Sequence, residues 1–340
     1  MKILILKPSS LGDVIQALPV LRLLKLHFPD SAIHWWIDSN LAPLLDGDPD
    51  LAGIVRFERK RWSSPRYWPE AVRSVRWMRE QNFDWVMDLQ CLARSGAFAW
   101  LARGKLLAGL DEPREGANGF YDIITRRASY HTHAVDWYLS LLTKLGVPVH
   151  WNFTWLPLRA DAAASVKSKW NTSGVRWIAL QPGARWLNKR WPVAHFAELV
   201  KLTAARFPGV RFVVLGGAED KPLGEEIARA VPERCLNVAG KISLPEMIEW
   251  LRLCDVIVTN DTGPMHAAAA LGKPVVAMLG PTEARRTGPY GQVQMVLNHP
   301  LPCAPCMKSE CFLPEKVKCL TSISPGQVFK RLCALLDAGR

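Results

Sequence analysis

The sequence lacks a hydrophobic run long enough to cross a membrane. No apolar stretch approaches the roughly 18 residues that a transmembrane helix needs, and the apolar start at residues 1–7 is too short for the core of a signal peptide. With 49% hydrophobic and 22% charged residues, it also lacks the low-apolar composition of a disordered chain. We therefore expect a globular, cytoplasmic protein, whose eight cysteines are reduced thiols or metal ligands more often than disulfides.

Two common nucleotide-binding motifs are also missing. The chain has neither the Gly-rich dinucleotide fingerprint nor the Walker lysine loop, which argues against a dehydrogenase and an NTPase. The acidic repeat Asp46-x-Asp48-x-Asp50 resembles the start of a calcium loop. However, Leu51 stands where that loop needs glycine, and Phe57 stands where it needs glutamate. We interpret the repeat as a solvated acidic turn before a strand.

What the chain does have is length and positive charge. Its 340 residues suffice for two domains with separate cores. A formal charge of +12 and a pI near 9.5 favour anionic partners such as nucleic acid, phosphorylated molecules or a membrane surface. One basic stretch with interleaved aromatic residues suits base stacking or lipid headgroups, and its plain alternative is a solvated helix face. Its members are Arg56, Arg59, Lys60, Arg61, Trp62, Arg66, Tyr67, Trp68, Arg73, Arg76, Trp77 and Arg79.

Strand and helix patterns alternate along the whole chain. In the first half, strands are expected at residues 2–7, 33–37, 53–57, 85–89 and 106–110, and helices in a segment with Asp13 in its first turn, at 65–81 and at 132–145. In the second half, strands are expected at residues 177–180, 211–215, 236–238, 256–259 and 274–279, and helices at 193–207, 221–230, 244–253 and after residue 262. Such alternation predicts parallel sheets built from βαβ units.

The alternation is interrupted at residues 146–174, which carry prolines and a polar run. We predict a domain at residues 1–160, a second domain at 161–323, and a final helix in 324–340 that folds back across the junction. Doubly wound α/β domains bind ligands at the carboxyl ends of their strands. The expected fold class is therefore α/β, with two Rossmann-like domains facing a central cleft.

Several polar residues follow the expected strands. Residues 256–266 join a buried strand to a helix N-terminus, where free N–H groups and the helix dipole suit a phosphate. Asp261 and Thr262 stand there, and the plain alternative is that one of them only caps the helix. Lys189 can neutralise a phosphate, and Glu219 can accept hydrogen bonds from ribose hydroxyls. A surface charge explains Lys189 equally well, and a carboxylate at a helix N-terminus explains Glu219.

Asp13 lies in the first turn of the first helix, after the loop Ser9-Ser10-Leu11-Gly12. Its position alone is typical of a carboxylate that stabilises the helix dipole. The functional interpretation is a general base, because an ionised aspartate can accept a proton from a hydroxyl that becomes acidic in the transition state.

Near the C-terminus, four cysteines fall within 17 residues, as Cys303-x2-Cys306-x4-Cys311-x7-Cys319. Neighbouring lysines favour thiolates, so a structural zinc ion is chemically plausible. The spacing differs from that of a standard zinc ribbon, so an unmetallated segment is the alternative.

Together, three of these stretches resemble glycosyltransferase family 9, the ADP-heptose:lipopolysaccharide heptosyltransferases. The matching residues are Lys7-Pro8-Ser9-Ser10-Leu11-Gly12-Asp13-Val14-Ile15, then Pro182-Gly183 with Lys189-Arg190-Trp191-Pro192, then Asn260-Asp261-Thr262-Gly263-Pro264-Met265-His266. Gly272-Lys273-Pro274, Gly280-Pro281-Thr282 and Gly288-Pro289-Tyr290-Gly291 continue the likeness. Their order and separation extend it over nearly the whole chain.

The resemblance implies a GT-B fold and an inverting transfer of heptose from ADP-heptose to a phosphorylated, lipid-linked core acceptor, with no cofactor required for catalysis. It implies that Asp13 is the base and that Lys189 holds the donor phosphates. The nucleotide site would be formed by Glu219, Asp261, Thr262, Gly263 and His266. The cysteine segment and Lys189-Arg190-Trp191-Pro192 look more like the second and third heptosyltransferases of the core than like the first.

The basic stretch completes this interpretation. We assign the acceptor side to Ser10, Arg59, Lys60 and Arg61, and we expect peripheral contact with the cytoplasmic face of the inner membrane and no nucleic-acid partner. Other functions remain open: a family 9 transferase for another nucleotide sugar, or an epimerase of similar fold that converts the donor without an acceptor. Charge alone would also suit a nucleic-acid-binding protein with a steep salt dependence. His266 can be catalytic, contact phosphate or simply pack.

Overall fold

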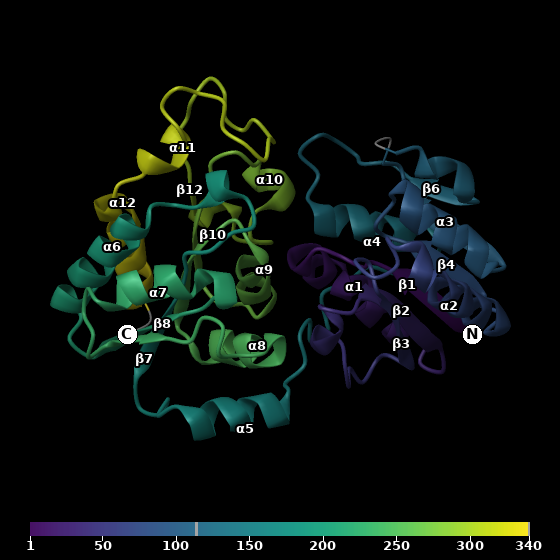
Figure 1. The fold of residues 1–340 in the computed structure, drawn as a ribbon, viewed down its shortest axis with the longest axis horizontal. Coiled ribbons are helices and arrows are strands. Elements are labelled where there is room, and N and C mark those ends of the chain that lie inside the picture. The colour runs from purple at the N-terminus through teal and green to yellow at the C-terminus, as the bar shows by residue number, and fades with distance from the viewer. Residues whose placement is uncertain (113–114, 339–340) are drawn as a thin grey trace. The chain divides into compact units, whose positions relative to one another are not determined.

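The computed structural model describes residues 1–112 and 115–338. The chain divides into two compact units, Met1–Pro157 and Leu158–Arg340, and the predicted boundary after residue 160 lies close to this division (Figure 1). Within the described residues, no helix is both long enough and apolar enough to span a bilayer.

The first unit is built on a parallel sheet of six strands in the order β3-β2-β1-β4-β5-β6. The strands are β1 (Lys2–Leu6), β2 (Ala32–Asp38), β3 (Gly53–Phe57), β4 (Trp85–Asp88), β5 (Leu106–Leu110) and β6 (Ile123–Thr125). The helices are α1 (Leu11–His27), α2 (Trp68–Glu80), α3 (Ala93–Ala102) and α4 (Ala134–Lys144), with short 3-10 turns η1 (Ala42–Leu44), η2 (Pro65–Tyr67) and η3 (Ala117–Phe120). Helix α1 packs against α4, and α2 packs against α3 (Figure 1). Because helices cover both faces, β1 reads as a continuous apolar run, as predicted.

The second unit repeats this plan with a parallel six-stranded sheet in the order β12-β11-β10-β7-β8-β9. The strands are β7 (Arg176–Gln181), β8 (Val210–Val214), β9 (Cys235–Asn237), β10 (Val256–Asn260), β11 (Val275–Met278) and β12 (Val296–Leu297). The helices are α5 (Ala160–Lys169), α6 (Val193–Arg206), α7 (Lys221–Ala228), α8 (Leu244–Leu253), α9 (Gly263–Ala270), α10 (Ala284–Thr287), α11 (Lys318–Thr321) and α12 (Pro325–Ala338). Short 3-10 turns are η4 (Leu187–Lys189), η5 (Ala218–Asp220) and η6 (Val293–Met295). Helix α5 packs on α8, and α6 packs on both α7 and α12.

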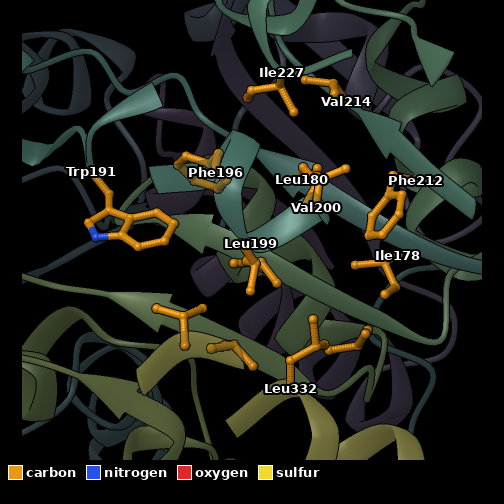
Figure 2. Packing of buried hydrophobic residues seen from close by; sticks show 14 of the residues in the cluster. Ile178, Leu180, Trp191, Phe196, Leu199, Val200, Phe212, Val214, Ile227 and Leu332 are labelled. Carbon is orange, nitrogen blue, oxygen red and sulfur yellow. The ribbon is translucent and has the colours of Figure 1, made fainter. Parts of the chain in front are cut away.

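Helix α12 belongs to the core of the second unit. Its buried Val328, Leu332 and Leu336 join the apolar cluster around α6 and the central strands, part of which Figure 2 shows. Such a face leaves water when it packs, at roughly 25 cal/mol per Å² of apolar surface. These contacts assign α12 to the second unit, and its predicted return across the junction stays a prediction.

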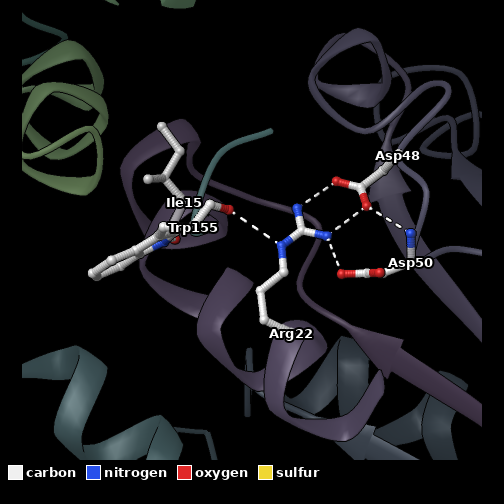
Figure 3. Close-up of polar contacts among 5 residues, drawn as sticks. All are labelled: Ile15, Arg22, Asp48, Asp50 and Trp155. Atoms are coloured by element: carbon white, nitrogen blue, oxygen red, sulfur yellow. Dashed lines mark hydrogen bonds and ion pairs between the residues drawn. The ribbon is translucent and has the colours of Figure 1, made fainter. Parts of the chain in front are cut away.

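The acidic repeat before β3 is not the solvated turn expected from the sequence. Asp48 is buried and accepts two hydrogen bonds of 2.6 Å from the guanidinium of Arg22, whose Nη1 also contacts Asp50 at 2.6 Å (Figure 3). Arg22 Nε donates to the carbonyl of Trp155, whose indole N–H donates to the carbonyl of Ile15. The repeat therefore holds a buried arginine of α1, which the local sequence could not reveal because the partners lie far apart in the chain.

Two helices, α3 and α5, were not predicted from the sequence. Helix α3 contains Gly96, where an added Cβ would lie 2.6 Å from the Phe120 ring. Close packing therefore requires a glycine here, and a glycine weakens the helical pattern of the sequence. Helix α5 falls in the stretch read as a polar junction, because Val166 is the one residue on it that is fully buried. Helix α1 is buried on nearly all sides from Gly12 to Leu24.

Candidate active site

Asp13 of the first unit lies where β1 passes into α1. The backbone N–H and the hydroxyl of Ser10 both donate to Asp13 Oδ2, at 2.9 Å and 2.5 Å. Ser10 is the N-cap residue and Asp13 the third residue of the helix, so the pair forms the polar start of α1. Both hydrogen bonds favour the ionised carboxylate, the form that a general base needs.

Lys7, which follows β1 directly, was not singled out as a site residue on its own. It is buried, its Nζ donates to the carbonyl of Leu89 at 2.9 Å, and it lies 4.9 Å from the centroid of the Tyr138 ring. Burial alone would lower the pKa of Lys7, but the charges of Tyr138 and Asp13 raise it above its ordinary value. The first unit thus keeps a buried ammonium group in the electrostatic field of Asp13.

A cavity of about 140 Å³ opens at the carboxyl ends of β1 to β4. Trp36 at its wall is fully buried, and its indole N–H has no hydrogen-bond partner among the described residues. Gln90 contributes an amide oxygen that likewise has no partner in the described structure. The cavity is lined by Pro8, Ser9, Trp36, Phe57, Arg59, Gln90, Leu92, Arg94, Ser95 and Glu115. With two arginines and an unpaired N–H in its wall, it suits a polar ligand that carries negative charge.

A buried carboxylate holds the turn that places Gln90 in this cavity. Asp88 ends β4, accepts the hydroxyl of Tyr121 at 2.7 Å, and accepts the backbone N–H groups of Gln90 and Cys91. Burial raises the pKa of Asp88, although these hydrogen bonds oppose the shift. The cavity wall therefore rests on a satisfied polar network.

The residues predicted for the acceptor side have different surroundings in the structure. Arg59 lines the cavity, whereas Lys60 is exposed. Arg61 pairs with Glu70 at 2.5 Å and lies over the Tyr67 ring at 4.3 Å. Ser10 contacts Asp13, as described above, so its first role in the structure is to hold that carboxylate.

In the second unit, Lys189 and Asp261 meet although they lie 72 positions apart. Lys189 Nζ contacts Asp261 Oδ2 at 2.6 Å, and the same oxygen accepts the hydroxyl of Thr282 at 2.6 Å. Lys189 also lies 4.6 Å from the centroid of the Trp186 ring. Asp261 and Thr282 are buried, and Lys189 is mostly buried. The arrangement aims one ammonium group at the carboxyl ends of β7 and β10.

Asn260, the last residue of β10, holds the two loops of this site together. Its side-chain oxygen accepts the backbone N–H of Trp191 at 2.9 Å, and its amide donates to the carbonyl of Pro182 at 2.7 Å. Asn260 is fully buried, so these bonds fix the loop that carries Lys189.

The loop after β8 carries two neighbouring acids, Glu219 and Asp220, whose surroundings differ. Glu219 is exposed, as a residue that meets a ligand would be. Asp220 is instead buried against Gly183, where an added Cβ would lie 2.1 Å from its carboxyl oxygen. Arg190 approaches Asp220 at 3.8 Å, and burial raises the pKa of this carboxyl. The sequence pointed to Glu219 and missed Asp220, which packs the loops against each other.

The helix N-terminus predicted as a nucleotide site is α9. Thr262 is its N-cap residue, and its side chain makes no capping hydrogen bond. Gly263 begins the helix, and His266 is buried one turn later. The first N–H groups of α9 are thus not capped by the Thr262 side chain, which is the state that a phosphate oxygen can satisfy.

The cysteine segment does not form the zinc site that the sequence left open as one of two alternatives. Within residues 1–112 and 115–338, no group of three or more His, Cys, Asp or Glu side chains is arranged to hold a metal ion. Cys303, Cys306, Cys311 and Cys319 line an apolar cavity of about 170 Å³. The sulfur of Cys311 accepts the Val317 N–H at 3.3 Å, and that of Cys319 packs on Gly280, so these thiols are used in packing. The suggestion of a structural zinc is not supported.

A family model for glycosyltransferase family 9 (heptosyltransferase) matches residues 71–317. The chain is 31% identical to lipopolysaccharide heptosyltransferase 1 of Pseudomonas aeruginosa, with 99% of each chain covered. It is 29% identical to lipopolysaccharide heptosyltransferase 2 of Salmonella typhimurium, covering 87% of this chain and 88% of that one.

Among solved structures, the chain is similar to the E. coli ADP-heptose lps heptosyltransferase II. The TM-score is 0.80 at 25% identity, and the match covers 100% of this chain and 99% of that one. This similarity confirms the GT-B fold class, with two parallel-sheet α/β domains, that the sequence predicted. Because the relatives include heptosyltransferases 1 and 2, the expected likeness to the second and third type stays a prediction.

Proposed function

The chain belongs to glycosyltransferase family 9, the lipopolysaccharide heptosyltransferases, and from this premise we propose that it transfers heptose from ADP-heptose to the inner core, with inversion at the anomeric carbon. The donor is suggested by the solved relative, which is described as an ADP-heptose enzyme. The acceptor is an inner-core sugar that carries negative charge and is linked to lipid.

The single observation that carries this proposal is the polar start of α1. Asp13 stands at the carboxyl end of β1, and both donors from Ser10 favour its ionised form. In the proposed reaction, an acceptor hydroxyl attacks the anomeric carbon from the face opposite the diphosphate. A C–O bond forms, the bond to the diphosphate breaks, and the hydroxyl proton passes to Asp13. A general base of this kind contributes roughly 10²–10⁴-fold to a rate.

The second unit supplies the groups for the leaving diphosphate. Negative charge grows on ADP as its bond to heptose breaks, and groups already aimed at that charge lower the barrier. We assign this role to Lys189 and to the N-terminal N–H groups of α9 at Thr262 and Gly263. Asp261 and Thr282 hold Lys189 in place, and His266 and Glu219 complete the proposed nucleotide site.

The acceptor is proposed to enter the cavity at the carboxyl ends of β1 to β4. Arg59 and Arg94 line that cavity, together with the unpartnered indole N–H of Trp36. These groups can bind the carboxylate or phosphate oxygens of a core sugar. Lys60 and Arg61 remain proposed acceptor residues at its margin, although Arg61 must then release Glu70.

The donor assignment is tested by calorimetric titration of the whole chain with ADP, UDP, GDP and CMP, and of the Lys189→Ala variant with the same nucleotides. We expect selective binding of ADP, weakened by roughly tenfold to a hundredfold in the variant, because one charge-assisted hydrogen bond contributes about 1.5–3 kcal/mol. Selectivity for UDP or GDP would retain the family and overturn the ADP-heptose assignment. A matched control is Lys201→Ala, a surface lysine of α6 in the same unit.

The stereochemical assignment needs the product. The anomeric configuration of the transferred sugar, read by NMR, should be opposite to that of the donor. Retention of configuration would contradict a single displacement with Asp13 as base.

A further inference from the structure

The outward faces of α2 and α3 carry large apolar side chains in contact with water. On α2, the exposed fractions are 58% for Trp68, 48% for Val72 and 37% for Trp77, and on α3 the value is 59% for Trp100. Trp68 and Val72 are four residues apart, so they share one side of the helix. A helix on a globular domain usually turns such residues inward, so their exposure marks a surface that meets an apolar partner.

The same surface is basic. Arg73 and Arg76 are exposed on α2, on the side of the helix between Val72 and Trp77. Arg103, at the end of α3, is exposed three positions after Trp100. Other arginines of this stretch are already engaged, since Arg56 pairs with Asp46 and Arg79 donates to a backbone carbonyl.

The two helices form one continuous surface. They pack side by side (Figure 1), and Arg79 Nε of α2 donates to the carbonyl of Leu101 in α3 at 2.7 Å. We call the exposed residues Trp68, Val72, Arg73, Arg76, Trp100 and Arg103 the α2–α3 face.

The α2–α3 face also adjoins the cavity proposed for the acceptor. Arg59, in the segment that leads to α2, lines that cavity, and so do Arg94 and Ser95 in the first turn of α3. Both helices therefore begin at the edge of the sheet where the cavity opens.

We propose that the α2–α3 face docks on an anionic phospholipid surface. Trp68, Val72 and Trp100 enter the headgroup region, where an aromatic ring buries its apolar body and keeps its N–H hydrated. Arg73, Arg76 and Arg103 pair with lipid phosphates. The combination of arginine with tryptophan matches a bilayer interface in both charge and polarity, whereas a purely apolar face would suit a protein partner equally well.

The biological role of this docking rests on the proposed function, since a lipid-linked acceptor would then lie beside the cavity. Lipid binding itself can be measured without transfer. The test is flotation of the full chain with vesicles of phosphatidylcholine, and with vesicles of phosphatidylcholine and phosphatidylglycerol in equal amounts. We expect binding to the anionic vesicles that weakens as salt is added. Failure of the wild type to float with the anionic vesicles overturns the proposal.

Two sets of substitutions separate charge from burial. Arg73→Glu, Arg76→Glu and Arg103→Glu together should lower the partition coefficient roughly a hundredfold or more, since each basic side chain contributes about a factor of five. Trp68→Ser, Val72→Ser and Trp100→Ser together should lower it by at least about tenfold. The matched charge control is Lys167→Glu, Arg211→Glu and Lys330→Glu, exposed positions of the second unit. An equal loss in that control overturns the proposal, because binding would then follow net charge alone.

Two further measurements distinguish the remaining outcomes. Analytical ultracentrifugation reports whether the α2–α3 substitutions convert a dimer into a monomer, which would identify the face as a contact between copies and overturn the lipid proposal. Transfer is measured with a water-soluble acceptor fragment and with the same acceptor held in anionic vesicles. The α2–α3 variants should keep wild-type turnover on the soluble fragment and lose it on the vesicles. Absence of turnover on both acceptors in the wild type refutes the proposed function and leaves the flotation result standing.

Discussion

The two units each pass from a strand into a helix through an aspartate, and the described hydrogen bonds to the two aspartates come from different distances in the sequence. Asp13 of the first unit accepts two hydrogen bonds from Ser10, three residues away. Asp261 of the second unit is held by Lys189 and Thr282, which are 72 and 21 positions away. The Asp13 carboxylate takes two hydrogen bonds from a neutral residue close in sequence and lies in the field of the buried Lys7 ammonium, whereas the Asp261 carboxylate is paired directly with a cation brought in by the fold.

This difference separates two chemical roles. Neutral N–H and O–H donors such as those of Ser10 favour the ionised carboxylate without neutralising its charge, so that the charge stays available for a proton. A carboxylate paired with lysine instead aims that ammonium group, and a diphosphate can compete for it as an opposite charge. The same contrast applies to the helix starts, because Asp13 supplies negative charge at the start of α1 whereas the Thr262 side chain leaves the start of α9 uncapped.

The largest expected effect comes from removing the charge of Asp13 in the first unit. Asp13→Asn keeps the shape of the side chain and removes its charge, so kcat should fall by about 10²–10⁴-fold. Affinity for ADP should stay within about twofold, because the proposed donor groups belong to the second unit. Steady-state kinetics and calorimetry on the same preparation check both values. A variant that keeps its turnover, or one that loses ADP binding instead, would remove Asp13 from the role of base.

The next effect concerns the pairing in the second unit. Lys189→Met leaves the buried Asp261 carboxylate without its cation, so the free energy of unfolding should fall by about 1–3 kcal/mol, less than the ~3–5 kcal/mol for a fully buried pair. Adding Asp261→Asn should restore most of that stability without restoring ADP affinity. Urea unfolding and calorimetry separate the two outcomes. If the double variant is no more stable than the single one, the pairing is not what holds Asp261.

The contrast between local and distant partners also explains what the sequence could predict. Strand and helix periodicity predicted most elements, and the short spacing of Ser10 and Asp13 placed them in one helix turn. The contacts of Arg22 with Asp48, and of Thr282 with Asp261, depend on which strands become neighbours, so no local pattern contains them. The unpartnered N–H of Trp36 likewise emerges only when four strand ends meet around one cavity.

Glu246 of α8 has both local and distant hydrogen-bond partners. It predicts a pH dependence of stability of moderate size. Its carboxylate accepts from its own N-cap residue Ser243 and from Lys169 and Ser165 of α5. Burial would raise the pKa of Glu246, but hydrogen bonds from Lys169, Ser243 and Ser165 outweigh it and lower the pKa from 4.5 to about 2. Because the folded pKa is depressed, the stabilisation is complete above pH 4.5 and is lost as the pH falls through about 2.

Glu246→Gln should therefore destabilise the protein by about 1–2 kcal/mol at pH 7, a value reduced because Lys169 is half exposed and its charge is screened. The difference from the wild type should shrink steadily between pH 4.5 and pH 2. Urea unfolding across this range measures it. A difference that stays constant with pH would mean that packing, and not charge, connects α5 to α8.

The smallest effect addresses Ser10 directly. Ser10→Ala removes the hydroxyl donor at 2.5 Å from Asp13 but keeps the backbone N–H donor at 2.9 Å, so stability should fall by about 0.5–1 kcal/mol. If Ser10 also holds the base, kcat should fall a few-fold, and the acid limb of its pH profile should move to higher pH because one donor to the charged form is lost. Ser243→Ala, at the start of α8, is the matched control, because it removes a similar cap and should leave kcat and its pH profile unchanged. If both variants lose the same stability but only Ser10→Ala changes the pH profile of kcat, that change is assigned to Asp13. The two caps differ in what their partner carboxylate does. Unchanged profiles in both variants would reduce Ser10 to a helix cap.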